Sequence, residues 1–155
     1  MIRLQFVRGS GLSSAAIAWF SQGTFSHVDA VLPDGTLLGA RSDVCGGQPP
    51  GVRVRPHGYE VWTQRVVFSI PASDAQAEAW EAFLRSQVGK PYDKIAILGF
   101  ALGRDWRDDG AWICSELGAA ALEATGIVPQ LYLAAAKITP EALALVCSAI
   151  GGTAG

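Results

Sequence analysis

The sequence is poor in cysteine and in charge, and each scarcity narrows the class of protein. Its three cysteines, Cys45, Cys114 and Cys147, are an odd number without CxxC spacing. That pattern disfavours a disulfide framework and a structural zinc site, so we expect reduced thiols. Only 17% of the residues are charged, the formal net charge is -2, and Lys and Arg are scattered. The chain therefore lacks the basic patch that indicates nucleic-acid binding.

A long apolar run is also missing. The longest run, residues 95–103, is about half the length that a bilayer-spanning helix needs. The N-terminal residues MIRLQFVRGSG contain no apolar stretch long enough for a secretory signal. We therefore expect a chain without an integral membrane segment, located in the cytoplasm or delivered by a phage or a secretion system.

What is present is enough apolar material for one domain, which we assign to residues 1–155. Alternating apolar residues and turn signals predict strands at about 2–6, 27–32, 36–41, 52–55 and 63–70. A short helix is expected after Ser13-Ser14, and three more helices follow in the second half. These are predicted from Ser73, with Gln76 as its capping partner, to about Gly89, from Cys114 to Thr125, and from Thr139-Pro140 onward. Strands followed by helices indicate an α+β fold.

Cys114 is the sharpest chemical feature of the sequence. It lies in Trp112-Ile113-Cys114-Ser115-Glu116-Leu117, where a glycine-rich loop gives way to a predicted helix. A thiol at a helix N-terminus feels the positive end of the helix dipole, which favours the thiolate, and the same amides can form part of an oxyanion site. The alternative interpretation of Cys114 is a small buried hydrophobic residue.

A thiolate nucleophile needs a base, and the chain has two histidines. His27 opens a predicted strand at the sheet end, where it can reach the N-terminus of a helix packed across the sheet. His57 lies in an expected loop and is the second candidate. Neither histidine belongs to a metal-binding motif such as HExxH, and no phosphate-binding loop is present, so we expect no metal and no cofactor.

Three short motifs in order resemble the YiiX-like branch of the NlpC-type papain-fold enzymes. They are Ser26-His27-Val28, then Gly89-Lys90-Pro91-Tyr92-Asp93, then Cys114-Ser115-Glu116-Leu117. In the unpermuted NlpC family the cysteine helix precedes the histidine strand, whereas here the histidine strand comes first. The resemblance extends from about residue 10 to residue 145 and implies a circularly permuted papain-like fold, with a small antiparallel sheet packed against helices.

The resemblance also implies roles for three residues. Cys114 would be the nucleophile, His27 the base, and Tyr92 the tyrosine beside the nucleophile that can donate to an oxyanion. In the relatives a polar residue on the strand after the histidine orients the imidazole. Here that position is Gly39, so we expect main chain, water or another side chain, such as Ser42 or Asp43, to hold His27.

These residues lead to a hypothesis about activity. The chain would be a cysteine hydrolase or acyltransferase that cleaves an amide or ester bond through a thioacyl intermediate. The family suggests two substrate classes, cell-wall peptides and lipid-like amides or esters. The alternatives are a papain-fold module that binds a peptide or lipid without turnover, and an unrelated α+β domain in which the Cys114 motif is accidental. The sequence leaves the oligomeric state open.

Overall fold

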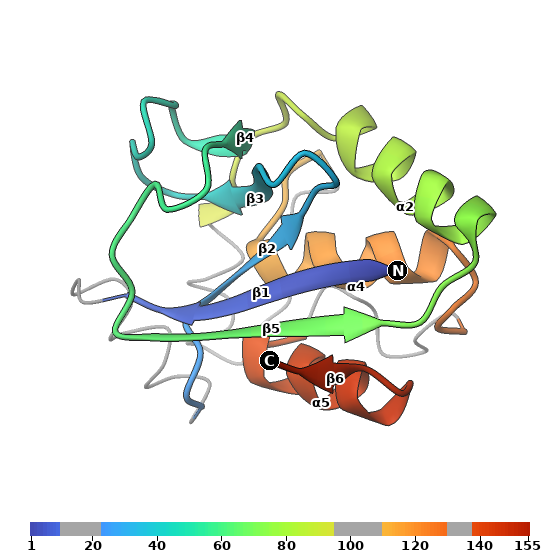
Figure 1. Cartoon of the computed structure of the whole chain (residues 1–155). Coiled ribbons are helices and arrows are strands. Elements are labelled where there is room, and N and C mark those ends of the chain that lie inside the picture. Colours follow the sequence, from blue (N-terminus) through green and yellow to red (C-terminus); the bar gives the residue numbers. More distant parts are fainter. Residues whose placement is uncertain (10–22, 95–109, 130–137) are drawn as a thin grey trace.

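The computed structural model describes residues 1–9, 23–94, 110–129 and 138–155 of the chain. In these residues one antiparallel sheet carries six strands, in the order β4-β3-β2-β1-β5-β6 (Figure 1). The strands are β1 (Ile2–Arg8), β2 (His27–Val31), β3 (Leu37–Arg41), β4 (Gly51–Arg55), β5 (Gln64–Ile70) and β6 (Thr153–Ala154). The two long strands β1 and β5 pair along their whole length, and β2 pairs with β1 on the other side.

The five predicted strands are all present, with bounds shifted by one or two residues. The strand β6 was not predicted, because two residues are too short to produce an alternating pattern. The helix expected after Ser13-Ser14 and the apolar run 95–103 lie outside the described residues.

Three helices follow the first five strands: α2 (Asp74–Ser86), α4 (Cys114–Ala124) and α5 (Pro140–Ala149). The Ser73 and Gln76 capping box is confirmed, and Thr139 caps α5 by accepting a hydrogen bond from the amide of Ala142. The helix α2 ends three residues before Gly89, earlier than expected. Gly89, with φ of 101°, instead turns the chain so that its amide donates to the carbonyl of Val52 at 3.0 Å.

The helix α4 lies at the centre of the fold. It packs against β2 and β3, with α2 and α5 as further neighbours (Figure 1). Its first four residues, from Cys114 to Leu117, are all buried. Ser115 fixes the start of α4 by donating a hydrogen bond to the carbonyl of Ile138 at 2.6 Å. This hydrogen bond ties the first turn of α4 to the residue just before the cap of α5.

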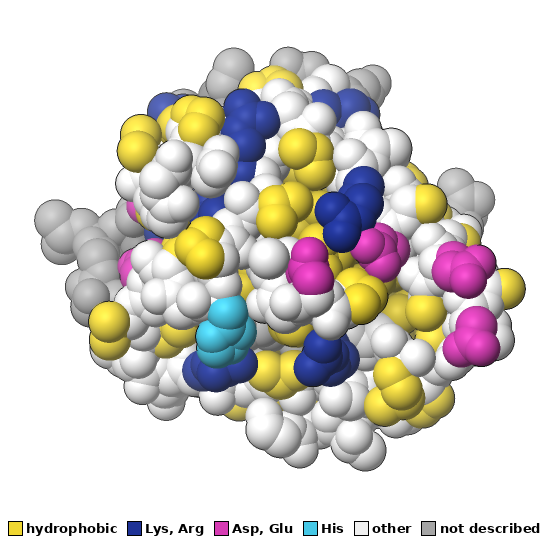
Figure 2. Space-filling view, turned by 45° about the horizontal axis from the view of Figure 1, so that its top comes forward, with side chains coloured by type: hydrophobic (Ala, Val, Ile, Leu, Met, Phe, Trp, Pro, Cys, Tyr) yellow, Lys and Arg dark blue, Asp and Glu magenta, His cyan; other side chains and the backbone are white. Residues whose placement is uncertain are grey.

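The surface carries mixed charge. On the face shown in Figure 2, cationic and anionic side chains are interspersed with apolar ones, and no broad area has a single sign. Among the helices that the structure describes, none has both the length and the hydropathy to cross a membrane.

Candidate active site

The site is built around His27, the first residue of β2, which is 8% exposed. The chain just before it is held from two sides. The amide of Ser26 donates to the carbonyl of Val7 on β1 at 2.9 Å. The carboxylate of Glu141, in the first turn of α5, accepts a hydrogen bond from the amide of Thr24 at 2.8 Å. His27 is thus positioned by both the sheet and α5.

The group that orients His27 is Asp29, which the sequence analysis did not propose. Side chains two residues apart on a strand lie on the same side, and Asp29 Oδ1 is 2.9 Å from His27 Nε2. Asp29 is 1% exposed, so this ion pair is shielded from solvent. Of the side chains expected to reach His27, Asp43 pairs with Arg41 instead, through two hydrogen bonds of 2.8 and 2.9 Å.

Gly39 explains why the carboxylate can come from β2. A Cβ atom at position 39 would overlap Asp29 Oδ1. The glycine on β3 therefore leaves a space open, and the Asp29 carboxylate occupies it from the neighbouring strand. The expectation named main chain, water, Ser42 or Asp43, whereas the structure places the carboxylate of Asp29 on the imidazole.

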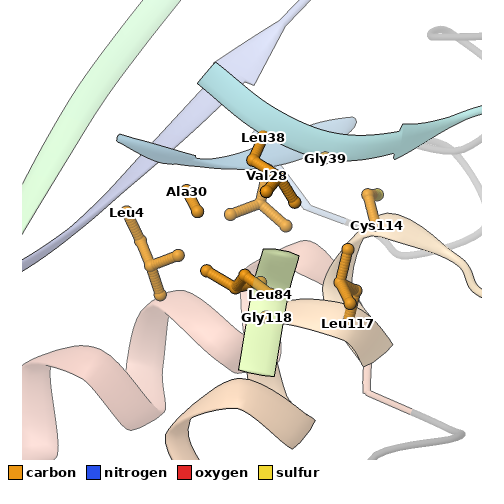
Figure 3. Close-up of a pocket in the computed structure, with 9 residues that line it drawn as sticks. All are labelled: Leu4, Val28, Ala30, Leu38, Gly39, Leu84, Cys114, Leu117 and Gly118. Atoms are coloured by element: carbon orange, nitrogen blue, oxygen red, sulfur yellow. The ribbon is translucent and has the colours of Figure 1, made fainter. Parts of the chain in front are cut away.

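Cys114 is the first residue of α4, at the end of the helix where the amides are unpaired. Burial raises the pKa of the thiol, but the charge of His27, a hydrogen bond with His27 and one from the amide of Val28 together lower the pKa below its ordinary value. Because Asp29 occupies Nε2 of His27, Nδ1 is the ring nitrogen left for the sulfur. The side chain of Cys114 points from α4 toward β3 (Figure 3).

His27 is strongly basic in this environment. Burial disfavours the charged ring, yet the negative charges of Asp29 and Cys114 and the hydrogen bonds to both outweigh it and raise the pKa to about 9. A raised imidazole pKa beside a lowered thiol pKa favours transfer of the thiol proton to the imidazole. The arrangement therefore favours loss of the Cys114 proton and places an imidazole that can accept it next to the sulfur.

Tyr92 lies beside this pair. Tyr92 and Trp112 form an isolated parallel β-bridge. In it the amide of Trp112 donates to the carbonyl of Pro91, and the amide of Asp93 donates to the carbonyl of Trp112, both at 3.1 Å. Burial and the charge of Cys114 raise the pKa of the Tyr92 phenol well above its ordinary value. The phenol therefore stays protonated and is able to donate a hydrogen bond close to the sulfur.

The remaining candidates lie elsewhere. His57, the second candidate base, is exposed and contacts Arg65 Nη2 through Nε2 at 3.1 Å. Cys147 is buried in α5, where burial raises its pKa to about 12. Burial also raises the pKa of Cys45, which sits in the loop before β4. Cys114 is the cysteine of the three whose surroundings favour the thiolate.

A small cavity lies beside Cys114, between α4 and the sheet. Its lining is Leu4, Val28, Ala30, Leu38, Gly39, Leu84, Cys114, Leu117 and Gly118 (Figure 3). The space amounts to about 10 Å³. A single water molecule needs about 10–15 Å³ and polar partners, and this lining is apolar. The cavity is therefore a packing void beneath the site and not a place for a substrate.

The sequence analysis did not propose two residues of the site, Asp29 and Tyr59, and only Asp29 has a recognisable sequence pattern. Asp29 stands in the strand segment His-Val-Asp-Ala-Val, and a carboxylate two residues from a histidine in an otherwise apolar strand was a usable signal. Tyr59, whose hydroxyl donates to Asp29 Oδ2 at 2.8 Å, comes from the segment between β4 and β5. Nothing in the local sequence distinguishes it from any other loop tyrosine.

Comparison with known proteins supports the fold. The crystal structure of the metalloprotein YiiX from Escherichia coli O157:H7 superimposes with a TM-score of 0.57 over 80% of this chain, at 20% sequence identity. The match spans 64% of the YiiX chain, so this chain covers less than two thirds of that protein. No protein-family model and no curated protein sequence matches the chain. The fold is thus an α+β fold like that of YiiX.

Proposed function

We propose that this protein is a cysteine-dependent hydrolase or acyltransferase that acts on an amide or ester bond. The observation that carries the proposal is the alignment of Asp29, His27 and Cys114, with a buried 2.9 Å carboxylate–imidazole contact and a thiol of lowered pKa. Nucleophile, base and orienting group recur in this arrangement on unrelated folds, so geometry identifies the chemistry better than sequence does.

In the proposed reaction the Cys114 thiolate attacks the carbonyl carbon, and the carbonyl oxygen becomes an oxyanion. The amides at the start of α4 and the Tyr92 hydroxyl are the candidate donors to that oxygen. The His27 imidazolium then gives its proton to the leaving amine or alcohol, leaving a thioester on Cys114. Neutral His27 next takes a proton from water or another acceptor, which releases the acid or the transferred product.

The order of the motifs fits a permuted relative of the NlpC-type enzymes. In this chain the histidine strand β2 precedes the cysteine helix α4, and the two still meet in space. Under this proposal the substrate is a cell-wall peptide or a lipid-like amide or ester. The likeness to YiiX covers the fold and leaves the choice between the two substrates to experiment.

YiiX is described as a metalloprotein, which raises the question of a metal site here. Within residues 1–9, 23–94, 110–129 and 138–155, no three His, Cys, Asp or Glu side chains converge in a way that could hold a metal ion. Nε2 of His27 and Oδ1 of Asp29 face each other and bind one another. These residues do not fit a metal, and the proposed mechanism contains no metal-dependent step.

A binding module without turnover was the alternative while the orienting residue was unknown. The position of Asp29 weakens that alternative, because a buried carboxylate on the imidazole fixes its tautomer and stabilises the imidazolium.

Two activated esters test the proposal: the p-nitrophenyl ester of a medium-chain fatty acid and the p-nitrophenyl ester of an N-acyl dipeptide. We expect a burst of nitrophenolate and a thioacyl adduct on Cys114, located by intact mass and peptide mapping. Cys114→Ser and His27→Gln should abolish both signals, whereas the matched controls Cys45→Ser and His57→Gln should retain them. Release without an adduct on Cys114, or equal loss in the two histidine variants, would contradict the proposal.

A further inference from the structure

The Asp29 carboxylate is itself held by a second layer of side chains. Its Oδ1 faces His27, and its Oδ2 accepts a hydrogen bond of 2.8 Å from the hydroxyl of Tyr59. The same hydroxyl lies 3.3 Å from Nε2 of His27. Both oxygens of the carboxylate are therefore engaged, and rotating the group would break one bond or the other.

Tyr59 is in turn fixed by Arg41 at the end of β3. Nη1 of Arg41 donates to the Tyr59 hydroxyl at 3.3 Å, and the guanidinium carbon lies 5.5 Å from the centre of the Tyr59 ring. Arg41 is anchored by Asp43 and by Glu60, whose Oε2 lies 2.7 Å from Nη1. The chain of contacts thus runs from a fixed guanidinium through one hydroxyl to the carboxylate that orients His27.

Trp62 packs against both His27 and Tyr59. Its ring stacks on that of His27, with centroids 6.3 Å apart and planes at 24°, and it meets the Tyr59 ring edge-on at 5.5 Å. Tyr59 and Trp62 both come from the segment between β4 and β5, so one loop closes over the histidine and its carboxylate. Asp29 itself is 1% exposed, so its hydrogen bonds are made out of contact with solvent.

We propose that Tyr59 is a positioning residue of this active site: its hydroxyl, fixed by Arg41, locks the Asp29 carboxylate on His27. The proposal rests on the function proposed above. Burial and the charge of Asp29 hold the pKa of Tyr59 far above its ordinary value, although Arg41 opposes them, so the hydroxyl remains a donor across the working pH range. Without that donor the carboxylate can rotate, and His27 would spend part of its time without its partner.

Tyr59→Phe tests this directly, because it removes the hydroxyl and keeps the ring against Trp62. We expect kcat for the p-nitrophenyl ester to fall about tenfold, the effect of one hydrogen bond to a charged group, with KM changed less than about twofold. The pKa of His27, followed by NMR of the imidazole protons, should fall from its raised value. Phe68→Leu, a core substitution on β5, is the control for a general loss of stability, and should leave the His27 titration unchanged.

A double-mutant cycle distinguishes action through Asp29 from an independent role. In an Asp29→Asn background, Tyr59→Phe should have little further effect on kcat or on the His27 titration. If Tyr59→Phe does not fold, Arg41→Lys, which removes the donor to the hydroxyl but keeps a cation, should produce a smaller change of the same sign. If Cys114 is reactive in the wild type and the His27 titration is unchanged in Tyr59→Phe, the role of Tyr59 is overturned and the proposed function stands. A wild type in which Cys114 is unreactive would instead overturn the proposed function.

Discussion

At the scale of single residues, the account depends on a glycine and a carboxylate on neighbouring strands. Gly39 has no side chain, and Asp29 fills the space that this leaves beside His27. The sequence predicts Cys114, His27 and Tyr92 as site residues because each belongs to a short motif. It was not sufficient to select Asp29, because the space above Gly39 depends on the pairing of β2 with β3.

Gly39→Ala should damage the site without unfolding the chain. The new Cβ would overlap Asp29 Oδ1, so the carboxylate must move away from His27. We expect ester turnover to fall by about 10- to 100-fold, short of the roughly 10⁴-fold loss that removal of an orienting carboxylate can cause. Asp29→Asn, measured in parallel, should be the more severe of the two. A Gly39→Ala variant as active as the wild type would show that Asp29 does not orient His27.

At the scale of elements, the site depends on how the start of α4 is fixed. The five main strands and the three helices could be predicted from alternation, capping residues and turn signals, because these signals are local. The contacts that bring α4 to the end of β2 are long-range and leave no local pattern. A further long-range contact is the buried hydrogen bond from Ser115 to the carbonyl of Ile138, which ties the start of α4 to the residue just before the cap of α5.

Ser115→Ala should therefore destabilise the fold. The substitution leaves a buried carbonyl without this donor, which costs about 1–3 kcal/mol. Urea denaturation measures the difference, and the matched control is Ser148→Ala, whose hydroxyl bonds back to Ala144 within α5 in a partly buried position. The control should change the free energy of unfolding by less than about 0.5 kcal/mol. Equal effects of the two substitutions would mean that Ser115 does not anchor α4.

At the scale of the whole molecule, the buried charges couple folding to pH. Cys114→Ser removes the thiolate and isolates the pair of His27 and Asp29. His27 has an ordinary pKa of 6.5. Burial lowers the pKa in the folded chain, but Asp29 and Cys114 together raise it, and in Cys114→Ser the interaction with Asp29 is the one that remains. Burial opposes ionisation of Asp29, but the charge of His27 and hydrogen bonds from His27 and Tyr59 lower its pKa below 3.8.

The sign of the effect follows from these two shifts. A histidine with a raised folded pKa stabilises the fold fully below pH 6.5 and loses that contribution as the pH rises through the folded value. Asp29 stabilises the fold above pH 3.8 and loses that contribution as the pH falls through its lowered folded pKa. Urea denaturation of Cys114→Ser should therefore give a maximum free energy of unfolding between about pH 4 and pH 6.5, with a decline above it. Adding Asp29→Asn should flatten that decline, and a decline of equal slope in both proteins would contradict the coupling.

Limiting iodoacetamide tests whether Cys114 is an activated thiol paired with His27. Alkylation is followed by peptide mapping between pH 5.5 and 8 for the wild type, His27→Gln and His57→Gln. We expect Cys114 to react first at pH 6, where an ordinary thiol is largely protonated, and to lose this advantage in His27→Gln but not in His57→Gln. Cys45 reacting ahead of Cys114 in the wild type, or a Cys114 rate unaffected by His27→Gln, would contradict the account.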